Sequence, residues 1–138
     1  MKAKNLFTSS LLLVMFLFSC GNKQPTKADL MVGKWRFFSL NLVATTGSED
    51  DKLTEKFYQD MAKNTQYTFE KDGNYLFSST TPESGTWKIT EDGKTISLTV
   101  KASGEKRDFT VVNLTQKELV YTFNGTAYKY LRRDEEEK

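Results

Sequence analysis

The stretch that decides the fold is residues 85–100, which read GTWKITEDGKTISLTV. In each half, apolar residues alternate with polar ones, as in Ile96-Ser97-Leu98. Alternation with a period of two is typical of a β-strand with one buried face. Between the halves, Asp92-Gly93 supplies residues that tolerate the positive φ angles of a tight hairpin turn. The stretch therefore predicts an antiparallel β-hairpin.

The same pattern continues in both directions from this hairpin. Asp72-Gly73 and Asn124-Gly125 are two further tight-turn sequences, and Pro82 and Gly104 mark other turns. Because all links after the first are short, consecutive strands are expected to pair as a meander. The predicted strands are 34–43, 65–70, 74–80, 85–90, 94–101, 106–114, 118–123 and 126–132.

Every second residue of these strands belongs to one apolar set, whereas the alternates are mostly Lys, Thr, Ser, Glu and Asn. An open sheet would leave this face uncovered, because only one helical segment is available, and closure also removes exposed edges. We therefore predict an all-β fold: an eight-stranded antiparallel up-and-down (meander) barrel. The inward set is Trp35, Phe37, Tyr67, Phe69, Tyr75, Phe77, Trp87, Ile89, Ile96, Leu98, Val100, Phe109, Val111, Leu119, Tyr121, Phe123, Tyr128 and Tyr130.

The one helical segment lies in the long first connection, over residues 50–63. Leu53, Phe57 and Met61 recur there at four-residue spacing on a polar background, which indicates a short amphipathic helix. These three residues are a candidate lid or plug across one open end of the barrel. A helix packed on the outside of the barrel is an equally weighted alternative.

The first 19 residues have the pattern of a signal peptide. Lys2 and Lys4 give a positive start, and an apolar stretch follows up to Phe18. Thr8, Ser9 and Ser10 interrupt that stretch, which is therefore a weaker candidate for a membrane-spanning helix of ~20 apolar residues. We expect the chain to be exported.

The segment Leu17-Phe18-Ser19-Cys20 resembles the lipobox of bacterial lipoproteins. The resemblance implies cleavage after Ser19 and lipidation of Cys20, so that the membrane is a partner through this anchor. Cys20 is the only cysteine, and lipidation would explain an unpaired thiol in an exported protein. Gly21 after the cysteine favours, by the same resemblance, the outer membrane facing the periplasm. No acidic cluster of the kind that sends some lipoproteins to the cell surface follows in residues 22–27.

Net charge excludes one class of partner. Without Lys2 and Lys4, 18 of the 20 basic residues remain against 18 acidic ones, so the processed chain is formally neutral. No basic patch indicates nucleic acid, and we expect none to bind. We expect four parts: signal peptide 1–19, lipidated N-terminus and linker 20–29, barrel 30–133 and charged tail 134–138.

Motifs around the first strand carry a family resemblance. Val32-Gly33-Lys34-Trp35 before a long loop and a meander resembles the lipocalin-like domains of small bacterial lipoproteins of the Bacteroidetes type. The segments 69–75 and 85–89 also fit, and the resemblance covers about residues 30–133. It implies a structural role at the closed end for Gly33 and Trp35, with Arg132 or Arg133 over the tryptophan ring. The chain lacks the disulfide and the clear C-terminal helix of the family.

Enzymatic chemistry is not expected. The chain has no histidine and its one cysteine is Cys20, which excludes histidine-assisted nucleophiles and histidine or cysteine metal sites. Asp72 and Asp92 belong to turns, and Asp50 and Asp51 to a helix start, so carboxylates already have local explanations. We predict no catalytic residues, no metal and no cofactor.

The aromatic interior has two interpretations, because an eight-stranded barrel can be filled by side chains or can hold one small ligand. The first predicts binding of a small hydrophobic or amphipathic molecule. The second predicts a filled barrel in an envelope interaction module, an inhibitor or assembly accessory, whose protein partner is unknown. The candidate ligand-lining residues are Phe37, Tyr67, Phe69, Tyr75, Phe77, Trp87, Phe109, Tyr121, Phe123, Tyr128 and Tyr130.

Overall fold

A computed structural model describes residues 24–42 and 47–133. The predictions for the signal peptide, for Cys20 and for the charged tail lie outside the described residues. The elements are α1 (Lys27–Met31), β1 (Gly33–Leu42), α2 (Glu49–Ala62), β2 (Gln66–Phe69), β3 (Asn74–Ser78), β4 (Glu83–Ile89), β5 (Thr95–Val100), β6 (Lys106–Leu114), β7 (Glu118–Phe123) and β8 (Thr126–Arg132).

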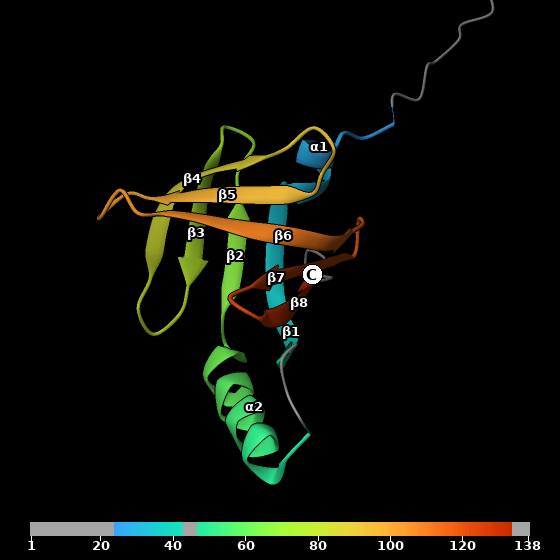
Figure 1. Cartoon of the computed structure of the whole chain (residues 1–138). Coiled ribbons are helices and arrows are strands. Elements are labelled where there is room, and N and C mark those ends of the chain that lie inside the picture. The colour runs from blue at the N-terminus through green and yellow to red at the C-terminus, as the bar shows by residue number, and fades with distance from the viewer. Residues whose placement is uncertain (1–23, 43–46, 134–138) are drawn as a thin grey trace, which may run out of the picture.

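The eight strands form one closed barrel in sequence order, as predicted (Figure 1). Each strand pairs antiparallel with the next, and β1 closes the barrel by pairing antiparallel with β8. The β7–β8 turn has the expected chemistry, because Asn124 (φ 47°) and Gly125 (φ 74°) both have positive φ angles. β4 begins at Glu83, two residues before the predicted start, since Glu83 already pairs with Phe77.

The predicted inward set forms the core, and two irregularities in strand pairing add to it. The register of β1 against β8 shifts between Phe37 and Ser39, and that of β6 against β7 shifts between Val111 and Asn113. A bulge of this kind changes which residues point inward. The shifts direct Leu40 and Leu114 into the core, where the exposed fractions are 2% and 7%.

The short helix α1 was not predicted, and it begins within the stretch assigned to the linker. Thr26 caps it: the Asp29 backbone N–H donates to Thr26 Oγ1 (3.1 Å), and the Thr26 backbone N–H donates to the Asp29 carboxylate (2.9 Å). At its other end Met31 is fully buried in the core. The helix therefore belongs to the folded barrel.

Trp35 closes the end of the barrel next to α1. Its indole Nε1 donates to the Met31 carbonyl (2.8 Å), and the Arg132 guanidinium lies 4.5 Å from its ring centroid. Arg132 also donates to the carbonyls of Leu30, Val32 and Gln116. At Gly33 (φ 138°), an added Cβ would lie 2.3 Å from Arg132 Nη1. The structure places Gly33, Trp35 and Arg132 together at this end of the barrel, and we call it the closed end.

The helix α2 lies at the other end of the barrel, beyond the end of β1 and before the start of β2 (Figure 1). Ser48 caps it reciprocally with Asp51, which agrees with the prediction of a helix over 50–63 to within a residue. We call this the open end. In the described part of the chain, no helix has the length and apolar content needed to cross a membrane.

Candidate functional site

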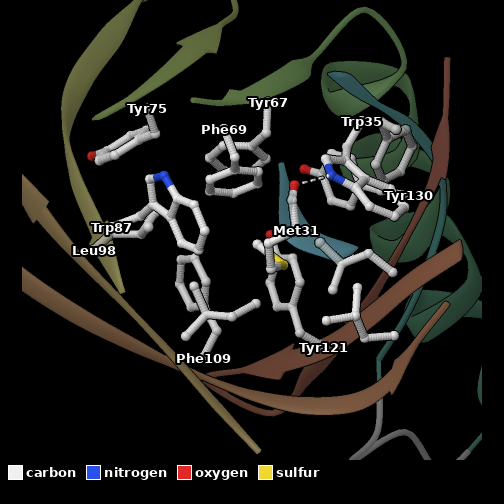
Figure 2. Close-up of a cluster of buried hydrophobic side chains, with 14 of the residues drawn as sticks. Met31, Trp35, Tyr67, Phe69, Tyr75, Trp87, Leu98, Phe109, Tyr121 and Tyr130 are labelled. Carbon is white, nitrogen blue, oxygen red and sulfur yellow. Dashed lines mark hydrogen bonds between the residues drawn. The ribbon is translucent and has the colours of Figure 1, made fainter. Parts of the chain in front are cut away.

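Aromatic rings in contact fill the barrel from the closed end to its middle. Neighbouring ring centroids lie 4.6 to 5.9 Å apart along a series that begins in β4 and ends in β6. Figure 2 shows Met31 among these rings. Contacts at this spacing are those of a packed aromatic core. The series is Trp87, Phe69, Tyr67, Tyr130, Tyr121 and Phe109.

Tyrosine hydroxyls give this interior a polar centre. Hydrogen bonds join the hydroxyls of Tyr67 and Tyr121, of Tyr121 and Tyr130, and of Tyr130 and Thr65. Burial raises the pKa of Tyr67 and Tyr121, and it raises the pKa of Tyr130 to about 12. Among the described residues, no buried side-chain nitrogen or oxygen lacks a hydrogen-bond partner. The hydroxyls are therefore neutral and satisfied.

Inward-facing residues at the open end are only partly buried. Leu42 ends β1, Phe123 ends β7, and Phe77 and Tyr128 lie close to the ends of their strands. We call these four residues the rim. The rim rings continue the interior stack, as Tyr67 and Phe77 (4.5 Å between centroids) and Phe109 and Phe123 (5.0 Å) do.

A charged cluster adjoins the rim. The Arg107 guanidinium contacts the Glu83 carboxylate (3.0 Å) and the Glu105 carboxylate (2.8 Å), and the Tyr75 hydroxyl donates to Glu83 (2.7 Å). Glu83 is also the register partner of Phe77. The side chains of Arg107 and Glu83 are 26% and 19% exposed, so the pair is largely shielded from solvent. We call Glu83, Glu105 and Arg107 the charged cluster.

The pKa shifts in the charged cluster follow from its contacts. The hydrogen bond from Arg107 lowers the pKa of Glu105, and the two carboxylates raise that of Arg107. Burial and then the hydrogen bond to Glu83 raise the pKa of Tyr75. Both carboxylates contact the same guanidinium. With one guanidinium and two carboxylates, the charged cluster carries a net charge of −1.

The rim and the charged cluster together form the candidate site. Aromatic surface beside a few polar groups is the usual composition of a small-molecule site. Nothing in this set is a nucleophile with an adjacent base. Within residues 24–42 and 47–133, no three His, Cys, Asp or Glu side chains are grouped so that they could hold a metal ion.

A separate hollow of about 640 Å³ lies on the barrel wall over β3, β4 and β5. Outward-facing Leu76, Thr86, Thr99 and Lys101 contribute to its lining. It is distinct from the rim, of which it includes no member.

The predicted ligand-lining residues divide into two groups. Eight are buried in the filled part of the barrel, with exposed fractions of 2% to 7%, and three belong to the rim at the open end. Only the rim residues expose ring surface to an arriving molecule. The buried group is Phe37, Tyr67, Phe69, Tyr75, Trp87, Phe109, Tyr121 and Tyr130, and the rim group is Phe77, Phe123 and Tyr128.

The candidate lid residues are largely exposed in this structure. Leu53, Phe57 and Met61 are 66%, 61% and 63% exposed. Neither a helix plugging the open end through these residues nor one packed through them on the outside is found. The reason is the rotation of α2, which turns its polar side toward β1: Gln59 Nε2 donates to the Leu40 carbonyl (3.1 Å).

Sequence reasoning missed the charged cluster. Arg107 precedes Phe109 by two residues and Glu83 precedes Gly85 by two, so both occupy inward positions of their strands. A charged residue in an inward register was the available signal. Apolar character alone does not identify such a residue as inward-facing.

Comparisons with known proteins agree with this architecture. A lipocalin-like protein from Bacteroides uniformis has 17% sequence identity and a TM-score of 0.57, and the match covers 75% of this chain and 99% of that one. A DUF4847 family protein from Bacteroides vulgatus has 11% identity and a TM-score of 0.54, with 78% and 96% covered. These similarities show the shared fold.

A search among curated proteins finds no match to this chain. The family model described as a lipocalin-like domain matches residues 31–121, which is more than half of the sequence. The match covers β1 to β6 and the first part of β7, including Trp35 and the charged cluster. The chain therefore belongs to the lipocalin-like domain family.

Proposed function

We propose that this protein is a lipid-anchored envelope protein that binds one small hydrophobic or amphipathic molecule at the open end of its barrel. The observation that carries the proposal is the rim, where inward-facing aromatic rings remain partly exposed. A barrel used only as a core gains nothing from leaving such rings in contact with water. The filled interior below the rim favours a shallow site over a deep one.

The charged cluster favours one kind of polar head on such a molecule. Its net charge of −1 lies beside Phe77, so an ammonium or hydroxyl head is more compatible with it than a carboxylate. Because the cluster is partly exposed, the discrimination is expected to be small, about two- to fivefold in affinity.

A displacement assay tests both parts of the proposal. The neutral fluorophore N-phenyl-1-naphthylamine is titrated into the protein and then displaced by dodecylamine, dodecanol or dodecanoate, which share one chain length. We expect one bound fluorophore per chain, with dodecanoate the weakest competitor. Phe123→Ser should weaken fluorophore binding about tenfold, whereas Val112→Ser, an apolar but outward-facing and 64% exposed control, should not.

The contrary result would favour the second candidate function, an envelope interaction module with a filled barrel. The contacts among the interior rings support that alternative. Saturable fluorophore binding that Phe123→Ser leaves unchanged would contradict the rim as the site. Absence of any binding would contradict ligand binding as the function.

The proposed anchor has its own test. The signal-peptide pattern and the solitary Cys20 support lipidation, and the periplasmic face of the outer membrane is the proposed location. Cells that express the protein are labelled with an alkyne analogue of palmitate and then fractionated. We expect label in the wild-type protein, none in Cys20→Ser, and recovery of the labelled protein with the outer membrane. Labelling that survives Cys20→Ser would contradict the anchor.

A further inference from the structure

The two sides of α2 are arranged in reverse of the usual order for a helix beside a core. Its least exposed residues are Asp51, Glu55, Gln59 and Ala62, and its exposed stripe is apolar. A helix at the surface of a protein normally packs its apolar stripe and leaves its polar side in water. We call Leu53, Phe57 and Met61 the apolar stripe. An exposed stripe of this kind indicates a second surface that covers it.

The rim is a second apolar surface that is only partly covered. It lies at the same end of the barrel as α2, since β1 ends at the rim residue Leu42 and α2 leads into β2. Apart from β1, no strand makes extensive contact with α2. The hydrogen bond from Gln59 Nε2 to the Leu40 carbonyl joins the helix to β1. A rotation of α2 would break this hydrogen bond and move Ala62 from its packing against the core.

Two other occupants of the apolar stripe fit less well. Helices that lie on membranes are rich in Lys and Arg, but α2 carries five acidic residues against two lysines. A second copy of the chain is also a poorer fit, because the apolar stripe is too small. A helix of 14 residues is about 21 Å long, and one narrow stripe along it buries less than the roughly 800 Å² per partner of a stable interface.

We propose that α2 is a lid, which rotates to place its apolar stripe over the rim when the apolar part of a ligand occupies the open end. This inference rests on the proposed ligand-binding function. The ligand completes an apolar surface that neither the rim nor the stripe provides alone. Ser48, the N-cap residue of α2, forms a capping box with Asp51 in the first turn. Because both residues belong to α2 and its cap, the cap can move together with the helix. Rotation exposes Glu55 and Gln59 to water, where both are readily solvated.

A tryptophan reporter tests the movement. In the full chain carrying Phe57→Trp, the introduced indole starts exposed, while native Trp35 and Trp87 are 0% and 7% exposed and contribute a constant background. We expect saturating dodecanol to shift the emission of the introduced indole to shorter wavelength. The matched control is Phe38→Trp on the outer wall of β1, where the native side chain is 60% exposed, against 61% for Phe57. The control should not shift.

A kinetic measurement separates the lid from mere proximity to ligand. The double variant Leu53→Ser with Met61→Ser should release N-phenyl-1-naphthylamine about tenfold faster than the wild type, because the lid no longer covers the ligand. Replacing Lys52 and Lys56, which lie outside the stripe, by Ser should leave release unchanged.

The outcomes distinguish this inference from the proposed function. Suppose that dodecanol displaces the fluorophore, but the indole introduced by Phe57→Trp stays exposed or is already shielded without ligand. The lid is then overturned and ligand binding stands. Unchanged release in the stripe variant also overturns the lid. If no ligand binds, both proposals fall together.

Discussion

The two ends of the barrel use the same strands in different ways. At the closed end Met31 and Trp35 are fully buried, and Arg132 binds backbone carbonyls. At the open end the rim stays partly exposed, and Arg107 binds carboxylates. The strands have the same alternation of apolar and polar residues, so the difference comes from the two helices. At the closed end α1 inserts the Met31 side chain into the core, whereas at the open end α2 leaves the rim uncovered.

This contrast places most of the expected stabilisation at the closed end, while the proposed function places ligand binding at the open end. Buried apolar side chains and hydrogen-bonded carbonyls stabilise a fold. Partly exposed rings still have apolar surface in contact with water, and a ligand that covers this surface gains binding free energy. The following predictions, from the largest expected effect to the smallest, measure that division.

Alkaline pH should produce the largest effect, through the buried hydroxyls. Unfolded tyrosine ionises near pH 10, whereas burial raises the folded-state pKa of Tyr67, Tyr121 and Tyr130, to about 12 for Tyr130. The stabilisation is complete below about pH 10 and is lost as pH rises through the folded-state pKa. We expect cooperative unfolding in this range, with tyrosinate absorbance and circular dichroism changing together. Buried tyrosines that ionise before the fold is lost would contradict this account.

At the closed end, Trp35→Ala should reduce the free energy of unfolding by about 3–5 kcal/mol, because it leaves a cavity in a fully buried site. Denaturant titration measures the change. As a control, Phe38→Ala removes a ring that is 60% exposed, and it should cost much less. Equal losses in the two variants would refute the assignment of stability to the closed end.

Arg132→Met should cost about 2–3 kcal/mol, since the carbonyls of Leu30, Val32 and Gln116 lose a charged donor and Trp35 loses its cation. These three carbonyls are neutral, so the part of the loss that comes from them should depend little on ionic strength. A loss that disappears in high salt would show that the contact is mainly ionic.

Arg107→Met is the matching change at the open end, and we expect a loss of about 1 kcal/mol because Glu83 is left without its cation. Here the partners are partly exposed carboxylates, so added salt should reduce the loss. The two arginine variants, measured in the same denaturant series at low and high salt, should therefore respond differently. The same salt dependence in both variants would contradict this difference between the two ends.

The smallest effect is expected for Phe57→Ser in α2. The ring is 61% exposed, so the free energy of unfolding without ligand should change by less than about 0.5 kcal/mol. Denaturant titration in the absence of any ligand checks this value. A loss as large as that of Trp35→Ala would mean that the apolar stripe is packed in the free protein.

Alternation along the chain was sufficient to predict the meander, the closed barrel and the inward set. It failed at Leu40 and Leu114, because each follows a bulge whose position depends on the pairing with a neighbouring strand. It also failed at α1, since a helix of five residues is too short for a periodic pattern. Local patterns therefore predict elements, while shifts in register require the partner strand.

The candidate site was less predictable than the fold. Residue type identified the aromatic side chains, but the division between buried rings and rim depends on the height of each residue in the closed barrel. The charged cluster joins β4, β6 and the turn before β6, which lie near one another because both strands pair with β5. The rotation of α2 depends on tertiary contacts such as that of Gln59 with Leu40.

The position of α1 also determines which way the barrel would point on a membrane. Between Cys20 and the capping residue Thr26 lie positions 21 to 25, which span at most about 18 Å when fully extended. β1 has 10 residues and runs about 33 Å from one end of the barrel to the other. A lipid on Cys20 would thus hold the Trp35 end close to the bilayer and aim α2 into the aqueous compartment. Under the proposed anchor and ligand-binding function, an upright barrel would exchange ligand with soluble carriers or with a facing membrane, and not by lateral entry from the leaflet that anchors it.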